Sequence, residues 1–444
     1  MFLFLVKASN VSRCGVMRVL VKSYGCSANL ADGEVLAGCL AKAGYKLAAS
    51  ASEADVMVYN TCAVKGPTEN RIIETLKRVP PDKKIIVAGC LPLINFERLC
   101  REVHFDAVVG PSAGEKIVAI VERVLEGEKI VELGDALNAM PTLNLPRLRS
   151  NAVISILPVS YGCLGMCAYC CVVFARGHLR SYALEELTER MRKDLAAGAK
   201  EFWVTSQDTA CYGRDIGTNL AALLNALGDV EGDFRVRVGM MTPSMVTDIL
   251  DELIAAFKNS KVFKFLHLPV QSGDNRVLKR MQRFYTVQDF KEIVDAFRAA
   301  FPEVTLATDV ICGFPGETRE AFANTLKLIG EVKPDIVNVS KFFARPRTAA
   351  AEMHDAVVKP AEIKRRSTEA AKLVKRISLE RNQRWVGWTG EVLVDEKGKV
   401  PGSWIGRNFA YKPVTLKSSA DLFGKTLRVK VVKAFSTYLA GTAE

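Results

Sequence analysis

The chain has 444 residues, of which 49% are hydrophobic and 25% are charged, so it has ordinary globular composition and exceeds what one hydrophobic core organises. The apolar run at the N-terminus is short and lacks a basic flank, and no other run approaches about 18 apolar residues. We therefore expect no signal peptide, no membrane partner and a cytoplasmic location. In that compartment 12 cysteines favour metal binding or redox chemistry over disulfides.

Short β-like runs alternate with helical stretches in the first part of the chain. We expect strands at 18–26, 55–62, 84–90 and 105–110, and helices near 30–43 and 66–78. This alternation indicates a parallel sheet covered by helices, which we place at 17–130 as an N-terminal domain. Residues 1–16 add nothing to the pattern and are interpreted as an extension, either disordered or read from a mis-assigned start.

Three cysteines, Cys26, Cys62 and Cys90, each end one of these predicted strands. Because the carboxyl ends of parallel strands lie at one edge of a sheet, thiols distant in sequence can meet there. A single cysteine at a strand end is more often a small buried hydrophobe, but three in the same relative position favour metal ligands.

A second α/β series follows a proline-bearing linker at 131–150. Its predicted strands are 152–159, 201–206, 234–239, 264–270, 304–312 and 335–342. Six strand-helix units over 151–358 predict a partial (β/α)6 barrel, whose chemistry should lie at the carboxyl ends of the strands.

The last part of the chain is strongly basic. Residues 359–444 hold 18 basic and 8 acidic residues, a surplus of +10 in a chain of net charge +12. A basic helix is expected at 359–384, and short β-rich runs with glycine-containing turns predict a small β-barrel at 385–444. Such segregated charge favours contact with a polyanion such as nucleic acid, although a solvated basic face is the alternative.

The run YGCLGMCAYCC directly follows the first predicted strand of the barrel. Cys163, Cys167 and Cys170 have the spacing C-x3-C-x2-C, and no histidine lies near enough in sequence to complete a zinc site. A four-iron cluster normally takes four thiolates, so three would leave one iron open to bind a substrate. Adjacent residues cannot readily reach the same iron, so Cys171 is interpreted as a small buried side chain.

This spacing after a first barrel strand resembles the radical S-adenosylmethionine (SAM) superfamily. The stretches KSYGCSANLADGE, YNTCAVKGPTENR and VAGCLP resemble the N-terminal domain of the methylthiotransferases. They are followed in family order by HLPVQSGDNRVLKRM, TDVICGFPGET and a segment similar to the TRAM RNA-binding domain. The stretches TSQDTACYGRDIGTNL and ARGHLRSY are most similar to the archaeal and eukaryotic tRNA branch. That branch methylthiolates carbon 2 of N6-threonylcarbamoyladenosine at position 37, beside the anticodon.

The resemblance implies two [4Fe-4S] clusters. One would bind and cleave SAM and the other would receive the incoming sulfur; their ligands would be Cys163, Cys167 and Cys170 for the first, and Cys26, Cys62 and Cys90 for the second. The implied partners are a tRNA anticodon stem-loop, a sulfur donor and an electron donor such as ferredoxin or flavodoxin, and we expect a monomer.

Polar residues near the predicted barrel mouth are candidate SAM contacts: Gln207, Asp208, Gln271, Asp309, Gly313 and Arg176. For Asp208 and Asp309 a structural hydrogen bond is the alternative, and Arg176 could instead meet RNA phosphate. The candidate RNA contacts are Lys364, Arg365, Arg366, Lys375, Arg376, Arg428 and Lys430. The remaining cysteines are expected to pack as ordinary side chains: Cys14, Cys39, Cys100, Cys211 and Cys312.

Two other functions remain open at this point. A non-enzymatic RNA-binding protein with a structural metal would use the same basic C-terminus, but it would not need a C-x3-C-x2-C trio at a barrel strand end. A radical SAM enzyme that adds sulfur to a protein or small molecule would keep both clusters and not act on tRNA.

Overall fold

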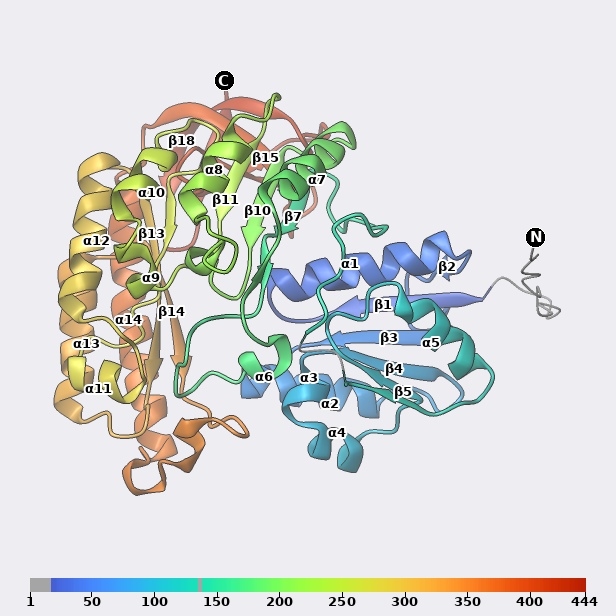
Figure 1. Ribbon diagram of the computed structural model, residues 1–444. Helices are drawn as coiled ribbons and strands as arrows, with labels where there is room; N and C mark the ends of the chain where they lie inside the picture. Colours follow the sequence, from blue (N-terminus) through green and yellow to red (C-terminus); the bar gives the residue numbers. More distant parts are fainter. Residues whose placement is uncertain (1–16, 135–137) are drawn as a thin grey trace.

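The computed structural model describes residues 17–134 and 138–444. Figure 1 shows an N-terminal sheet at the lower right, a partial barrel with its helices at the left, and a small C-terminal β-barrel at the top. The predicted extension at 1–16 and Cys14 lie outside the described residues. The mixed α/β fold class expected from the sequence is confirmed; the exact division into domains stays a prediction.

The N-terminal sheet is entirely parallel and has the strand order β2-β1-β3-β4-β5-β6. The strands are β1 (Arg18–Ser23), β2 (Lys46–Leu47), β3 (Val56–Thr61), β4 (Lys84–Gly89), β5 (Ala107–Val109) and β6 (Ile130–Glu132). The helices are α1 (Ser27–Lys42), α2 (Gly66–Lys77), α3 (Leu91–Ile94), α4 (Phe96–Glu102) and α5 (Lys116–Leu125). The sheet therefore extends through β6 into the segment that we expected to begin the linker.

Helices cover both faces of this sheet. On β3, Val56 and Val58 pack with side chains of α1 and α5, whereas Met57 and Tyr59 pack with side chains of α2, α3 and α4. All six residues of β3 are buried. Because alternate side chains of a strand point to opposite faces, this continuous apolar run is what a doubly covered strand requires.

The partial barrel has six parallel strands in chain order, as expected. They are β7 (Ile154–Pro158), β10 (Glu201–Thr205), β11 (Arg235–Val238), β12 (Phe265–His267), β13 (Thr305–Cys312) and β14 (Ile336–Lys341). The first three and the last three form two ladders. The ladders join through the parallel bridge of Val236 with Val262 and the hydrogen bond from the Phe263 amide to the Val236 carbonyl.

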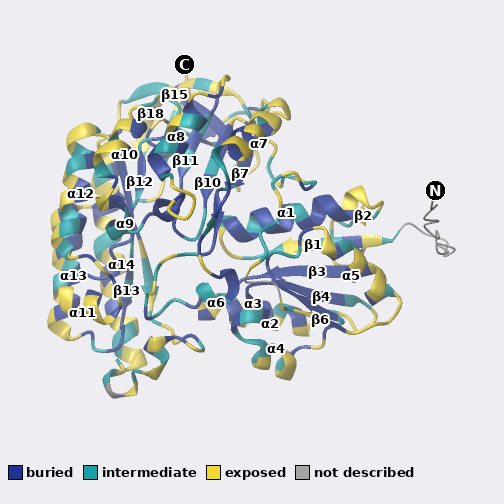
Figure 2. Cartoon of the chain, viewed as in Figure 1, coloured by how far each residue is buried: buried dark blue, intermediate teal, exposed yellow. Residues whose placement is uncertain are grey.

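The barrel helices are amphipathic. They are α7 (Leu184–Ala196), α8 (Leu220–Gly228), α10 (Leu250–Phe257), α12 (Val287–Ala300) and α13 (Arg319–Val332). Side chains cap the N-termini of three of them, α8, α12 and α13. In α12 the residues Phe290, Ile293, Val294 and Phe297 are buried, which is the spacing of one helical face. Thr286 caps this helix and forms a capping box with Asp289. In Figure 2 the buried colour accordingly concentrates on the strands and on the inner faces of the helices.

The long helix α14 (Pro360–Gln383) connects the barrel to the C-terminal domain, and Ser378 on it donates a hydrogen bond to the Asp335 carbonyl beside β14. The strands β15 (Thr389–Lys397), β16 (Ser403–Arg407), β17 (Pro413–Lys417), β18 (Thr426–Ala434) and β19 (Leu439–Ala443) then close into a barrel. Closure leaves no free sheet edge. Trp385 is buried in the core of this barrel, with Trp388 packed against it.

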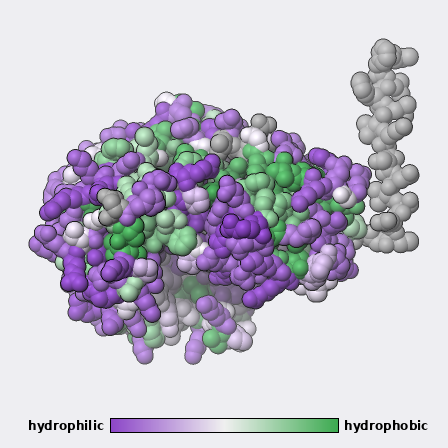
Figure 3. All heavy atoms as spheres, turned by 90° about the horizontal axis from the view of Figure 1, so that it is seen from below, coloured by the Kyte–Doolittle hydropathy of each residue, from purple (hydrophilic) through white to green (hydrophobic). Residues whose placement is uncertain are grey.

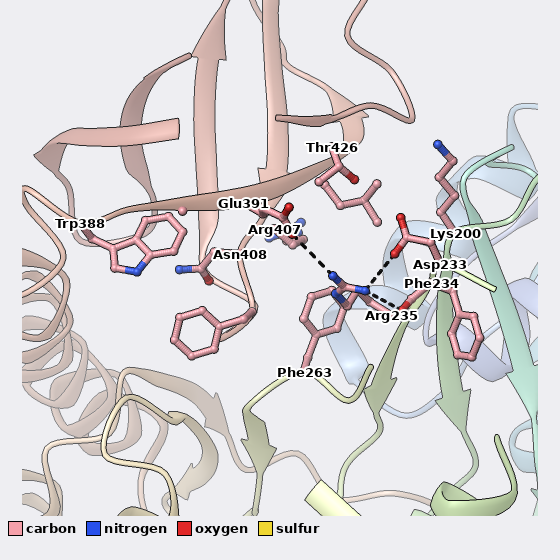
Figure 4. Close-up of a pocket in the computed structure, with 13 residues that line it drawn as sticks. Lys200, Asp233, Phe234, Arg235, Phe263, Trp388, Glu391, Arg407, Asn408 and Thr426 are labelled. Atoms are coloured by element: carbon pink, nitrogen blue, oxygen red, sulfur yellow. Dashed lines mark hydrogen bonds and ion pairs between the residues drawn. The ribbon is translucent and has the colours of Figure 1, made fainter. Parts of the chain in front are cut away.

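The C-terminal barrel covers the amino ends of β10 and β11. Between the two lies a cavity of about 270 Å³, lined on one side by residues such as Lys200 and Arg235 and on the other by Trp388 and Arg407 (Figure 4). The thiols lie beyond the opposite, carboxyl ends of the barrel strands, so this cavity is separate from the cysteine site. Within the described residues, no helix has the length and apolar character that crossing a membrane requires.

Candidate metal and cofactor site

A short irregular loop after β8 (Ser160–Tyr161) carries the first cysteine trio. Gly162 has φ +78°, and a side chain there would collide with the His178 carbonyl, so only glycine fits this position. The Gly162 amide donates to Gln207 Oε1 at 2.7 Å. The predicted cofactor residue Gln207 therefore anchors the start of the cysteine loop.

Each sulfur of this trio accepts an N–H donor. The Gly165 amide donates to Cys163 Sγ at 3.2 Å, the Val172 amide to Cys170 Sγ at 3.5 Å, and Arg283 Nη1 to Cys167 Sγ at 3.0 Å. Such donors favour sulfur in its thiolate form, which is the form that binds metal. The donor set therefore fits a thiolate-ligated metal centre.

The second trio meets at the carboxyl edge of the N-terminal sheet, as expected from its position after β1, β3 and β4. Gly25, with φ +105°, lies so close to Cys62 that a side chain there would collide with it. Burial raises the pKa of the Cys90 thiol to about 12; Arg176 opposes this shift, and the neighbouring Cys62 and Cys26 add to it. In the metal-free chain the Cys90 thiol is protonated at neutral pH, so a metal must displace that proton.

Arg176 does not occupy the place that the sequence suggested. Its side chain is 1% exposed and pairs with Asp32 Oδ2 at 2.6 Å, so it is not available to RNA phosphate. It lies beside the thiols of Cys90 and Cys26, and within the described residues its Nη1 has no hydrogen-bond partner. The assignment of Arg176 to SAM or phosphate is corrected: its free donor is beside the second trio, where it fits an anionic metal-sulfur group.

Residues next to the two trios meet at the junction of the N-terminal sheet and the barrel. Cys171 Sγ lies 3.8 Å from the carbonyl of Ala63, the residue after Cys62, and Cys171 is buried as expected. Ser27, next to Cys26, is hydrogen bonded through its hydroxyl to Thr205 at the end of β10, at 2.6 Å. Neighbours of both trios are therefore in direct contact.

Cys211 belongs to the site, although the sequence offered no spacing to indicate it. Ligand atoms of Cys163, Asp208 and Cys211 all lie within 4.8 Å of one another, and Cys211 is fully buried. Hydrogen bonding with Cys211 is the largest cause that lowers the pKa of the Cys163 thiol. Asp208 Oδ1 accepts the amides of Ala210 and Thr242, so the structural hydrogen bond considered for Asp208 is present.

The remaining predicted cofactor residues lie at the carboxyl ends of the later barrel strands. Gln271 has φ +67° and is 7% exposed; its amide donates to the Asp309 carbonyl. Gly313 donates its amide to Glu317 Oε2 at 2.7 Å, and its α-carbon faces α14, where a side chain would meet Ile363. These contacts hold the ends of β12 and β13 in place.

The Asp309 side chain is part of a polar group inside the barrel that the sequence did not indicate. It bonds His267 Nε2 at 3.1 Å and accepts from Asn338 Nδ2 at 2.6 Å. These two bonds lower the pKa of Asp309 against the opposing effect of its burial. Phe265 and His267 are two residues apart and share one face of β12, whereas Leu266 between them packs in the core with the barrel helices. This period of two was the available signal that His267 points into the barrel.

The predicted RNA-binding residues fall into three groups. Arg366 is 4% exposed and pairs with Glu317 at 2.7 Å and Glu362 at 2.9 Å, so its assignment as an RNA contact was wrong. Arg365 and Arg428 are exposed but engaged in ion pairs. The others are exposed and form no ion pair with a described residue: Lys364, Lys375, Arg376 and Lys430.

Family models match three parts of the chain. The Radical SAM superfamily matches residues 157–329, the Uncharacterized protein family UPF0004 matches residues 18–110, and the TRAM domain matches residues 383–443. The three matches coincide with the barrel that carries the first trio, the sheet that carries the second, and the closed C-terminal barrel. The superfamily match carries with it SAM and a [4Fe-4S] cluster as cofactors.

Several relatives match nearly the full length of the chain. A "Probable threonylcarbamoyladenosine tRNA methylthiotransferase" of Pyrococcus horikoshii is 42% identical over 96% of this chain and 99% of its own. The "Threonylcarbamoyladenosine tRNA methylthiotransferase" of Homo sapiens is 35% identical over 96% of this chain and 74% of its own. The solved radical SAM methyltransferase TsrM of Kitasatospora setae shares the fold, with a TM-score of 0.55 and 14% identity over 91% of this chain and 81% of that one. The chain belongs to the threonylcarbamoyladenosine tRNA methylthiotransferase family of the radical SAM superfamily.

Proposed function

We propose that this chain adds a methylthio group to carbon 2 of N6-threonylcarbamoyladenosine at position 37 of tRNA. The observation that carries the proposal is the contact between the two cysteine loops, where Cys171 beside one trio touches Ala63 beside the other. A sulfur-inserting enzyme needs its radical chemistry and its sulfur source at one place. The family membership favours this function over both alternatives left open by the sequence.

The first trio, Cys163, Cys167 and Cys170, would hold the SAM-binding [4Fe-4S] cluster, and the second trio, Cys26, Cys62 and Cys90, would hold an auxiliary one. When bound, these groups supply reductive cleavage of SAM and a binding position for sulfur. The protein residues hold the two sites in fixed positions, and three thiolates at each would leave a cluster there one iron without a protein ligand.

The charged side chains around the trios have separable roles. Arg283, 7% exposed, donates to Cys167 and supplies positive charge beside the first trio. Arg176 does the same beside the second, where its free Nη1 is the available donor. A buried cation stabilises negative charge on metal-bound sulfur more strongly than an exposed one, because the surroundings screen it less.

SAM would lie at the carboxyl ends of the barrel strands, below the first trio. Gln207 positions the cysteine loop on one side, and Asp208 holds the amides of Ala210 and Thr242 near Cys163. Gln271, Asp309 and Gly313 shape the opposite side. His267 and Asn338 complete the polar lining through their bonds to Asp309. These residues bind and orient the substrate, and the surrounding barrel excludes water.

The anticodon stem-loop is the proposed macromolecular substrate. Lys364, Lys375 and Arg376 lie on the exposed side of α14, and Lys430 lies on the C-terminal barrel. Phosphate contacts of this kind supply affinity that falls with salt. We further propose a cytoplasmic monomer that takes electrons from a donor such as ferredoxin or flavodoxin and sulfur from a separate donor.

Nucleoside mass spectrometry tests the proposed function. tRNA from cells with the gene should contain the 2-methylthio form of N6-threonylcarbamoyladenosine. tRNA from cells without the gene should contain only N6-threonylcarbamoyladenosine that lacks the methylthio group. The Cys167→Ala variant should fail to restore the product. An unchanged nucleoside profile, together with SAM cleavage by the purified chain, would show that the substrate is not tRNA.

A further inference from the structure

One aromatic side chain close to the first trio is largely exposed to solvent. Phe284 is 73% exposed, and nearby in the cysteine loop Met166 is 70% exposed and Leu164 is 42% exposed. Exposed apolar side chains are ordinary when scattered, but a group of them beside a reaction site marks a surface that a ligand covers. Figure 3 views the molecule from below and shows hydrophobic areas interrupting a mainly hydrophilic surface.

Two contacts tie the Phe284 segment to the cysteine loop. The Ala168 amide donates to the Met281 carbonyl at 2.9 Å, and Arg283 Nη1 donates to Cys167 Sγ at 3.0 Å. Phe284 directly follows Arg283, and Met166 directly precedes Cys167. Phe284 and Met166 are therefore each one residue from the contacting pair Arg283–Cys167, so the two segments that carry them lie side by side next to the first trio.

Hydrogen bonds of the two neighbouring residues hold the segment that carries Phe284 in place. Tyr285, 6% exposed, donates its hydroxyl to the Pro269 and Val270 carbonyls at 3.1 and 2.8 Å. The Arg283 amide donates to the Leu278 carbonyl at 3.0 Å, and Gln282 has φ +55°. Anchors on both sides keep an apolar ring facing solvent, a conformation that a ligand can use without first ordering the loop.

The helix that precedes Phe284 in the chain is cationic. The preceding helix α11 (Asn275–Arg280) carries Arg276, Lys279 and Arg280 and no acidic residue. Arg276 and Lys279 are exposed, and neither forms an ion pair with a residue that the structure describes. An exposed ring beside free cations is the combination that binds single-stranded nucleic acid, through base stacking and phosphate contacts.

We propose that Phe284, with Met166 beside it, forms a stacking platform for an unpaired base of the anticodon loop next to the modified nucleoside. This inference rests on the proposed function. The size of the patch favours a base over a protein partner, because three apolar side chains suit one or two rings, whereas stable protein interfaces bury about 800 Å² per partner. Stacking there would hold the anticodon loop over the first trio.

The test uses the full chain with its clusters reconstituted and a fluorescein-labelled anticodon stem-loop RNA that carries N6-threonylcarbamoyladenosine. Phe284→Ala should raise the dissociation constant measured by anisotropy at least about fivefold, since each stacked base contributes about 1–3 kcal/mol. Phe284→Trp should bind the RNA with the affinity of the wild-type chain, and the fluorescence of the introduced tryptophan should be quenched when RNA binds. Val131→Ala, at a residue 54% exposed on the edge strand β6, is the matched control and should leave binding unchanged.

Equal RNA affinity for Phe284→Ala and the wild-type chain would overturn the inference while leaving the proposed function intact, provided that the wild-type chain modifies tRNA. Slower cluster reduction by flavodoxin in Phe284→Ala, with equal reduction by dithionite and unchanged RNA affinity, would overturn it in favour of an electron-donor surface. If the wild-type chain neither binds nor modifies the RNA, the proposed function fails and the inference fails with it.

Discussion

Replacing Arg176 with methionine should destabilise the chain strongly, because the substitution leaves a buried carboxylate without its cation. The Arg176 and Asp32 side chains are 1% and 2% exposed, and Nη2 donates to Oδ2 at 2.6 Å. In Arg176→Met the Tyr161 hydroxyl, 2.7 Å from Oδ1, is the side-chain donor that remains with Asp32. Removing one member of such a buried pair costs about 3–5 kcal/mol in unfolding free energy.

Urea denaturation of the metal-free chain, followed by circular dichroism, measures this loss without a contribution from iron binding. Arg214→Met is the matched control, because Arg214 and Asp248 are 31% and 60% exposed and such a pair contributes less than about 1 kcal/mol. The double variant Asp32→Asn with Arg176→Met should recover part of the loss, since no buried charge is then left alone. If Arg176→Met and Arg214→Met have the same unfolding free energy, the reasoning is refuted.

Three further predictions concern single groups. The pKa of Glu201 is raised to about 8, first by burial and then by a neighbouring carboxylate, so the folded state holds that proton more tightly than the unfolded state. Stability should therefore fall between about pH 4.5 and about pH 8, by at most about 1.4 kcal/mol per pH unit, and melting curves of Glu201→Gln should lack this decline; an equal decline would contradict the assignment. Cys211→Ala should lower the reduction potential of the first cluster in a redox titration followed by electron paramagnetic resonance, because Cys163 loses a hydrogen-bond donor, and an unchanged potential would count against this role. Lys375→Ala should reduce the salt dependence of RNA binding by about one phosphate contact, whereas Arg366→Ala should instead lower the melting temperature; the reverse pattern would contradict the structure.

The sequence predicted those features that depend on the order of elements along the chain. Cys26, Cys62 and Cys90 could be grouped because each follows a strand of a parallel sheet, and such strands end at the same edge. The partial barrel and the closed C-terminal barrel followed from repeated strand and helix patterns in the same way. These predictions needed no knowledge of side-chain directions.

Contacts between distant residues could not be predicted in this way. Arg176 and Asp32 are 144 residues apart, and only the packing of the sheet against the barrel brings them together. Cys211 lacks any spacing pattern and reaches Cys163 because the ends of β7 and β10 are neighbours in the barrel. Arg366 belongs to a basic run, but its position on α14 turns it toward Glu317 and away from solvent.

Iron and sulfide analysis of anaerobically reconstituted protein tests most directly that each trio holds its own cluster. The wild-type chain should bind about eight iron atoms, and each triple alanine variant about four. Loss of Cys163, Cys167 and Cys170 should also abolish the spectral change on adding SAM, and loss of Cys26, Cys62 and Cys90 should preserve it. A wild-type chain that binds about four iron atoms, or zinc without sulfide, would contradict the account.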